Sequence, residues 1–171
     1  MNIRQENEGD FGAIYALVKK AFETAAMSQG DEQDYVDHIR SGDTYIPELS
    51  LVAEKDGHIV GHIMLASTKV RGGNRTHDFL VLAILSVAEE HRRGGLGSAL
   101  VYVALDRARR MGHRAIFLAG NRDYYSRFGF IPASRYGISF KEDVPAELID
   151  NIMALELVPG SLEGISGIVD L

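Results

Sequence analysis

The chain has 171 residues, and 18 Lys and Arg against 24 Asp and Glu give it a formal net charge of −6. It contains no cysteine, which excludes a disulfide framework, a thiolate nucleophile and a cysteine-based metal site. A hydrophobic share of 46% is typical of a globular protein, and the length predicts a single domain spanning residues 1–171.

The first half of the chain contains patterns of both helices and strands. In chain order they predict a short strand from Asn2, helices over 11–24 and 32–39, and strands over 49–54 and 59–68. Asp56-Gly57 lies between the last two apolar runs, and this dipeptide is typical of a tight hairpin. We therefore expect those two strands to be antiparallel neighbours.

The middle of the chain predicts a crossover. Residues 79–87 form an uninterrupted apolar run, which indicates a strand buried on both faces. A helix with regular apolar spacing follows over 95–111, ends at Gly112, and leads to a short apolar strand over 115–119. The two strands should be parallel neighbours, because a helix joins them through short loops.

The last third predicts shorter elements, and it completes the fold class. It contains a helix of one or two turns over 122–128, strands over 130–133 and 152–157, and a Gly-rich tail without a strand. The fold class is α/β, with a mixed and mostly antiparallel sheet that contains one parallel crossover.

The segment from Val87 to Ser98 carries the clearest functional signal. It joins the most apolar strand to the best helix, and it contains glycines together with Arg92 and Arg93. A Gly-rich turn that opens a helix presents free backbone N–H groups at the positive end of the helix dipole, an arrangement that binds phosphate. The alternative is a turn that only tightens strand–helix packing. The spacing matches neither the nucleotide-binding P-loop nor the dinucleotide-binding Gly-x-Gly-x-x-Gly motif.

Two motifs resemble one enzyme family. Arg92-x-x-Gly95-x-Gly97 is similar to the Gln/Arg-x-x-Gly-x-Gly/Ala pyrophosphate loop of the GNAT acyl-CoA-dependent N-acetyltransferases. Tyr124-Tyr125-Ser126-Arg127-Phe128-Gly129-Phe130 resembles the aromatic segment that follows the fifth strand in the same family. Further segments over 49–63 and 153–160 resemble its YhbS-like subgroup, so the resemblance covers most of the chain.

The resemblance implies a GNAT fold and an acetyl-CoA site. The backbone of the strand end would pair with the pantetheine arm, and the Val87 N–H would polarise the thioester carbonyl. Tyr125 would face the sulfur. As a phenol of pKa near 10 it is a weaker acid than a thiol near 8.5, so a strong hydrogen bond describes its role better than full proton transfer. The implied cofactor-binding residues are Leu85, Ser86, Val87, Arg92, Arg93, Gly94, Gly95, Leu96, Gly97, Ser98, Asn121 and Tyr125, and the implied catalytic residues are Tyr125 and Val87.

The resemblance implies acetyl transfer from acetyl-CoA to a primary amine. The absence of cysteine rules out a Cys acyl-enzyme and supports direct attack by the amine. The amine must lose a proton, either to a water chain or to a side chain. The candidate bases are Asp78, Glu89, Glu90, His62 and His77. The six histidines lack His-x-x-x-His spacing, so we expect no metal.

The expected partner is a small-molecule amine or a peptide, and no motif identifies it. The acidic balance disfavours nucleic acid, and no run approaches the ~20 apolar residues of a membrane helix. The polar N-terminus resembles no signal peptide, so we expect a cytoplasmic protein, with a homodimer left open. Two other functions stay open at this point: a CoA-binding sensor with little turnover, and acetylation of protein N-termini or lysines.

Overall fold

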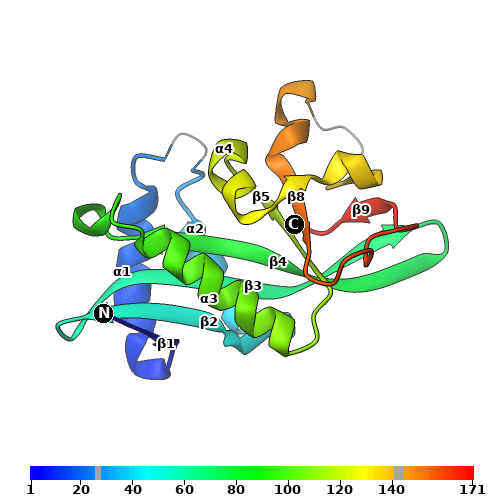
Figure 1. The fold of residues 1–171 in the computed structure, drawn as a ribbon. Coiled ribbons are helices and arrows are strands. Elements are labelled where there is room, and N and C mark those ends of the chain that lie inside the picture. The colour runs from blue at the N-terminus through cyan, green and yellow to red at the C-terminus, as the bar shows by residue number, and fades with distance from the viewer. Residues whose placement is uncertain (26–27, 141–144) are drawn as a thin grey trace. The chain divides into compact units, whose positions relative to one another are not determined.

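The computed structural model describes residues 1–25, 28–140 and 145–171. The chain divides into two compact units: unit 1 contains Met1–Ala66 and Ala83–Arg107, and unit 2 contains Ser67–Leu82 and Ala108–Leu171. The elements, drawn in Figure 1, are β1 (Asn2–Gln5), α1 (Phe11–Phe22), α2 (Glu32–Arg40), β2 (Tyr45–Lys55), β3 (His58–Gly72), β4 (Arg75–Val87), α3 (Leu96–Arg110), β5 (Ala115–Ala119), α4 (Arg122–Tyr125), β6 (Ile131–Pro132), β7 (Ile138–Ser139), β8 (Ile152–Glu156) and β9 (Gly167–Val169).

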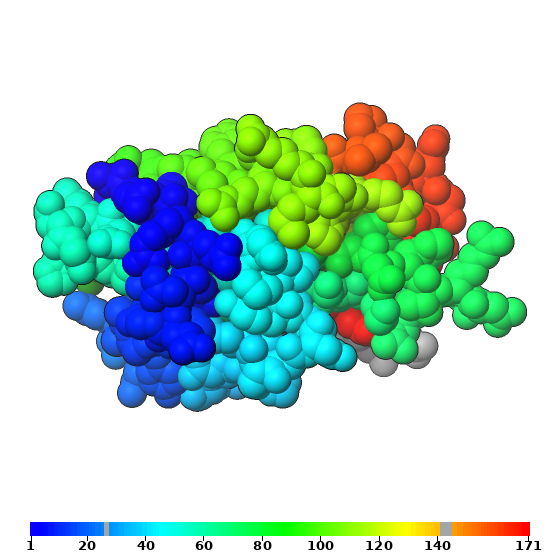
Figure 2. Space-filling model, turned by 90° about the horizontal axis from the view of Figure 1, so that it is seen from below, coloured from blue at the N-terminus to red at the C-terminus, as the bar shows by residue number. Residues whose placement is uncertain are grey.

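Unit 1 is an antiparallel sheet with helices on both faces. The strand order is β1-β2-β3-β4, and the predicted hairpin pairs Leu51 of β2 with Ile63 of β3. In Figure 1, α3 crosses in front of these strands, and α1 and α2 lie behind them. Figure 2 shows the start of the chain, in blue, against the cyan surface of the β2 region, as expected from the β1–β2 pairing.

Gly61 of β3 permits the close approach of α3. A Cβ at this position would lie 2.9 Å from Cδ1 of Leu100, which is too close for a carbon–carbon contact. Leu100 and its helical neighbours Val101 and Ala104 are fully buried, as the apolar spacing of the helix predicts. The absence of a side chain at Gly61 therefore determines how closely the helix packs on the sheet.

The next residue of β3, His62, points to the opposite face, where a buried polar cluster joins β1, β2, β3 and α2. The Glu6 carboxylate follows β1 and lies 3.0 Å from Nε2 of His62. It accepts hydrogen bonds from Nε (2.9 Å) and Nη2 (3.0 Å) of Arg40 in α2, and from the Tyr45 hydroxyl (2.7 Å) in β2. Ser50 Oγ lies 3.2 Å from the same His62 nitrogen.

The charges in this cluster follow from its burial. Burial opposes a charge on Glu6, but hydrogen bonds from His62, Arg40 and Tyr45 outweigh it and hold the pKa of Glu6 far below its usual range. Burial lowers the pKa of His62, which is therefore neutral. An ionised carboxylate only accepts, so Nε2 of His62 carries the proton and donates. Arg40 alone supplies the positive charge.

Unit 2 contains the predicted parallel crossover. β5 pairs in parallel with β4 at Leu80↔Ile116 and Val81↔Phe117, which confirms the expectation from the sequence. On its other side β5 pairs antiparallel with β8, and β6 pairs with β8 in turn. The core of the unit centres on Phe117, whose ring meets that of Phe79 edge-on at 5.6 Å between centroids.

The prediction of a tail without a strand was wrong. β9 lies in that tail and pairs antiparallel with β3 at Val70↔Val169, and in parallel with β7, which the sequence analysis also missed. A Cβ at Gly72 would lie 2.1 Å from the Ser166 carbonyl oxygen. Glycine at this position permits the close approach of the two backbones. A glycine normally argues against a strand, but here it allows the strands to pair.

Within the described residues, no helix is long and apolar enough to cross a membrane.

We expect the free energy of unfolding to fall as the pH drops below about 6.5. The unfolded chain binds a proton at His62 there and the folded chain does not, so acid favours unfolding by up to about 1.4 kcal/mol per pH unit. Urea unfolding at several pH values measures this dependence. His62→Gln should flatten it, while His58→Gln, on an exposed side chain, should not. If the free energy of unfolding depends on pH equally in the wild type and in His62→Gln, His62 is not the buried neutral group that causes the dependence.

Candidate active site

The end of β4 lies in unit 1, and its side chains alternate between two environments. Ile84 and Ser86 are buried, whereas Leu85 and Val87 are half-buried. The ladder with β5 covers Leu80 and Val81, and β4 continues beyond it to Val87. The predicted pantetheine-binding residues therefore lie on a strand end that extends past its parallel partner's ladder.

The peptide that joins Val87 to Ala88 is held on both sides. The Ala88 N–H donates to the Val60 carbonyl at 2.9 Å, which ties the peptide to β3. The Val87 carbonyl accepts from Nε of Arg92 at 3.1 Å. The backbone at the end of β4 is thus fixed in place by two hydrogen bonds.

The loop after β4 places a glycine in a left-handed conformation directly before α3. Gly95 has φ +84°, a left-handed conformation that glycine adopts without strain, and its α-hydrogens face open space. Its carbonyl accepts from Ala99 N at 3.0 Å and begins the hydrogen bonding of α3. The amides of Leu96, Gly97 and Ser98 precede this bond, so they have no partner within the helix.

The predicted loop residues differ in what their side chains do. Arg93 is exposed, has φ +63°, and makes no hydrogen bond or ion pair with the described part of the chain. Arg92 is also exposed, but its guanidinium donates to two backbone carbonyls. The Leu96 side chain is buried under β3, so only its backbone faces the loop. Gly94 is exposed and Ser98 half-buried.

Tyr125 and Asn121 lie together in unit 2. Asn121 is the N-cap of α4, and its Oδ1 accepts from the Tyr124 N–H at 3.1 Å. The Tyr125 ring meets those of Tyr124 and Phe130 edge-on, at 5.0 and 5.9 Å between centroids. Burial raises the pKa of the Tyr125 hydroxyl well above its usual value, so the group is a neutral phenol that can donate a hydrogen bond.

Gly120 is a positioning feature that the sequence analysis missed. A Cβ there would lie 2.7 Å from Cε2 of Tyr125, so only glycine leaves room for the ring. The Gly120 N–H donates to the Asn151 carbonyl at 2.9 Å, which fixes the backbone behind the ring. The available signal was a lone glycine between a buried strand and a helix cap.

The candidate bases have different surroundings. Asp78 is exposed and paired with Lys69 at 2.6 Å, which lowers its pKa. Glu89 and Glu90 are exposed in a 3-10 turn after β4. His62 is fully buried and bound to Glu6, so it has no access to solvent.

Among the predicted site residues, the structure brings the β4 end and residues 92–98 together in unit 1, and Asn121 with Tyr125 in unit 2.

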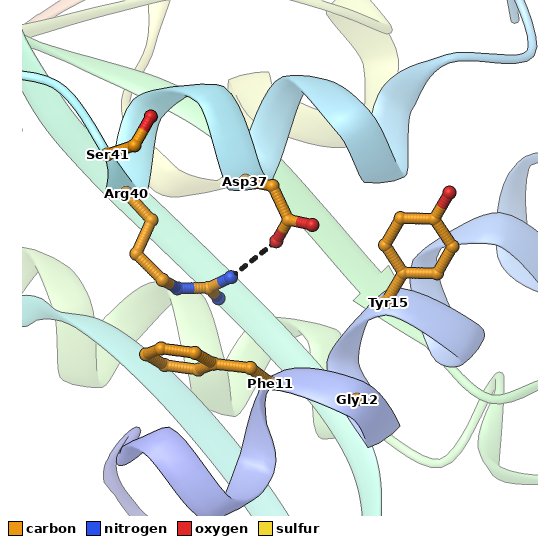
Figure 3. Close-up of a pocket in the computed structure, with 6 residues that line it drawn as sticks. All are labelled: Phe11, Gly12, Tyr15, Asp37, Arg40 and Ser41. Atoms are coloured by element: carbon orange, nitrogen blue, oxygen red, sulfur yellow. Dashed lines mark hydrogen bonds and ion pairs between the residues drawn. The ribbon is translucent and has the colours of Figure 1, made fainter.

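A separate groove lies between α1 and α2 (Figure 3). It has a volume of about 580 Å³ and is lined by Phe11, Gly12, Tyr15, Asp37, Arg40 and Ser41. The Arg40 guanidinium lies 3.9 Å above the centre of the Phe11 ring and donates to Asp37 at 2.7 Å. Arg40 thus lines the groove and also binds Glu6 in the buried cluster. The predicted site residues do not line the groove.

The fold agrees with the comparison to known families. A model of the acetyltransferase (GNAT) family matches residues 11–130. The chain belongs to the GNAT family. Its members are acyltransferases, so the family places this chain among the enzymes.

Individual GNAT relatives extend the similarity to the whole chain. The uncharacterised N-acetyltransferase YhbS of Escherichia coli is 30% identical over 99% of this chain and 95% of its own length. A second, YjhQ of E. coli, is 32% identical over 66% of this chain, and the match spans 62% of YjhQ.

Two solved GNAT structures share the fold closely. E. coli YhbS, determined in complex with CoA, has a TM-score of 0.85 and 28% identity over 99% of this chain and 88% of that one. An acetyltransferase from Brucella melitensis, in complex with acetyl-CoA, has a TM-score of 0.78 and 28% identity over 99% and 94%. The expected GNAT fold is confirmed.

We expect Gly120→Ala to displace the Tyr125 ring, because the new methyl group would overlap it. The near-UV circular dichroism of the tyrosines should change, and stability should fall by about 1–3 kcal/mol, as for overpacking. Gly12→Ala is the matched control. Its Cβ would meet nothing within 4 Å on the exposed face of α1, so it should stabilise the protein by about 0.5–1 kcal/mol. An unchanged tyrosine signal in Gly120→Ala would contradict the proposed role.

Proposed function

We propose that the protein transfers an acetyl group from acetyl-CoA to a primary amine by direct attack in a ternary complex. The observation that carries the proposal is the loop after β4, where the first-turn amides of α3 and the Arg93 side chain have no partner among the described residues. In the reaction the amine nitrogen forms a bond to the carbonyl carbon, the carbon–sulfur bond breaks, and the sulfur leaves as a thiolate. One proton leaves the amine and one reaches the sulfur.

The pyrophosphate fits the loop on chemical grounds. The amides of Leu96, Gly97 and Ser98 supply donors at the positive end of the α3 dipole, and the Ser98 hydroxyl adds another. Gly94 and Gly95 carry no side chain that would shield those amides. Arg93 supplies a full positive charge that the described residues leave unpaired.

The end of β4 is proposed to bind the acyl end of acetyl-CoA. The pantetheine arm contains amides, and an extended arm can pair with the backbone of Leu85 and Val87 as an added strand would. The Val87 N–H then donates to the thioester oxygen and stabilises the charge that develops there. The two hydrogen bonds that hold the Val87–Ala88 peptide keep this strand end rigid.

Tyr125 is proposed to donate a hydrogen bond to the departing sulfur. Full proton transfer from a phenol of ordinary pKa to a thiolate is uphill by about 2 kcal/mol, since the two pKa values differ by roughly 1.5 units. Burial raises the pKa of Tyr125 further and increases this difference. The hydroxyl therefore acts as a donor that stabilises the thiolate until solvent protonates it.

The test of the cradle is acetyl-CoA binding. Gly95→Glu should abolish it, because the substitution adds a side chain and a negative charge where the phosphates are proposed to bind. Gly73→Glu is the matched control. Gly73 also has positive φ (+57°) and open space at Cβ, but it lies in the β3–β4 hairpin. Titration calorimetry measures both variants, and equal binding by them would refute the cradle.

The test of turnover is CoA release from acetyl-CoA with a panel of amines and peptides. We expect at least one primary amine to give amine-dependent release. Tyr125→Phe should lower its kcat by about 10–100-fold, as is typical for the loss of one hydrogen bond to the transition state, and leave acetyl-CoA binding nearly unchanged. Binding without release by any amine would favour the CoA-sensor alternative.

A further inference from the structure

We infer, on the basis of the proposed function, that the Arg92 side chain is a positioning residue that ties β4 to α1, and that Arg93 provides the charge for the phosphates. Nε of Arg92 donates to the Val87 carbonyl at 3.1 Å, and its Nη2 donates to the Ala21 carbonyl at 3.2 Å. One guanidinium thus joins the end of the site's central strand to the end of the first helix.

The helix end explains why a cation is stable at this place. α1 ends at Phe22, so the carbonyl of Ala21 is one of the last four of the helix, which have no partner within it. These carbonyls form the negative end of the helix dipole, where a guanidinium is favoured. Arginine is suited to the task, because its donors lie on separate nitrogens in a fixed plane and can reach two carbonyls at once.

The other end of the tie lies beside the proposed reaction centre. The Arg92 bond holds the carbonyl of the Val87–Ala88 peptide, and the Ala88 N–H of the same peptide is bound to Val60. This peptide follows directly after the Val87 N–H that is proposed to polarise the thioester. Loss of the Arg92 bond should therefore loosen the oxyanion-stabilising backbone without removing a phosphate ligand.

Arg93 has the complementary properties. Its side chain is exposed and has no partner among the described residues, and its backbone adopts φ +63°, a conformation that is uncommon for a residue other than glycine, Asn or Asp. A strained backbone that presents an unpaired cation beside the first turn of α3 is consistent with anion binding. The two adjacent arginines thus have different functions.

The experiment compares Arg92→Ala and Arg92→Lys with Arg93→Asn, which removes the charge but tolerates the left-handed backbone. Arg107→Ala is the matched control, since Arg107 also donates to a backbone carbonyl, that of Glu48 at 3.4 Å. Acetyl-CoA affinity is measured by calorimetry at low and high salt. Amide hydrogen exchange is followed in peptides covering the last turn of α1 and the end of β4.

We expect Arg92→Ala to leave the acetyl-CoA Kd within about threefold, a change of less than 1 kcal/mol. It should speed amide exchange in the last turn of α1 and at the end of β4. It should also lower kcat about tenfold with any amine that the panel identifies. Arg92→Lys should recover part of the lost kcat. Arg93→Asn should raise the Kd about tenfold at low salt and less at high salt, with unchanged exchange. Arg107→Ala should change neither the Kd nor kcat.

The inference is overturned if Arg92→Ala weakens acetyl-CoA binding as much as Arg93→Asn, with the same salt dependence and unchanged exchange. Unchanged exchange at both ends of the tie also overturns it. If the wild-type protein fails to bind acetyl-CoA, the proposed function falls, but the exchange measurements still decide whether Arg92 ties β4 to α1.

Discussion

The buried carboxylate of Glu6 is the interaction on which unit 1 depends. It accepts from His62, Arg40 and Tyr45, and so connects β1, β2, β3 and α2 at one point. A buried charge without these partners would cost several kcal/mol, so the elements are stable only when all are in place. The cluster lies on the face opposite Gly61, and the packing of α3 on the other face is therefore built on a rigid sheet.

The proposed acetyl-CoA site consists mainly of backbone. Val87 offers an N–H, the glycine loop offers first-turn amides, and the side chain of Arg92 is engaged with carbonyls. Backbone donors are fixed by the strand and the helix that carry them, so they need little reorganisation when charge develops on a ligand. In the proposal, Gly94 and Gly95 have no side chain that could cover those amides.

Much of the fold was predictable, because local pattern and local structure agree. The apolar run before Val87 is a strand, the spacing from Leu96 onward is a helix, and the two strands around that helix pair in parallel. The tail was not predictable, because the pairing of β9 with β3 depends on a close approach between Gly72 and Gly167 that leaves no mark in either local sequence. The role of Gly120 was not predictable either, because it depends on the position of the Tyr125 ring and not on the neighbouring sequence.

The sequence by itself indicated the family and the order of the elements from β1 to β5, but it missed β7 and β9. It also identified the residue types at the phosphate loop and excluded a cysteine intermediate, because motifs and periodicity are properties of adjacent residues. Only the tertiary structure decided which groups are already engaged. It showed that Arg92 is bound to the Ala21 and Val87 carbonyls while its neighbour Arg93 has no partner among the described residues. It also showed that His62 is neutral and buried beside Glu6. The physical reason is that hydrogen bonding and burial depend on residues distant in the chain, so two arginines that look equivalent in sequence acquire different chemistry.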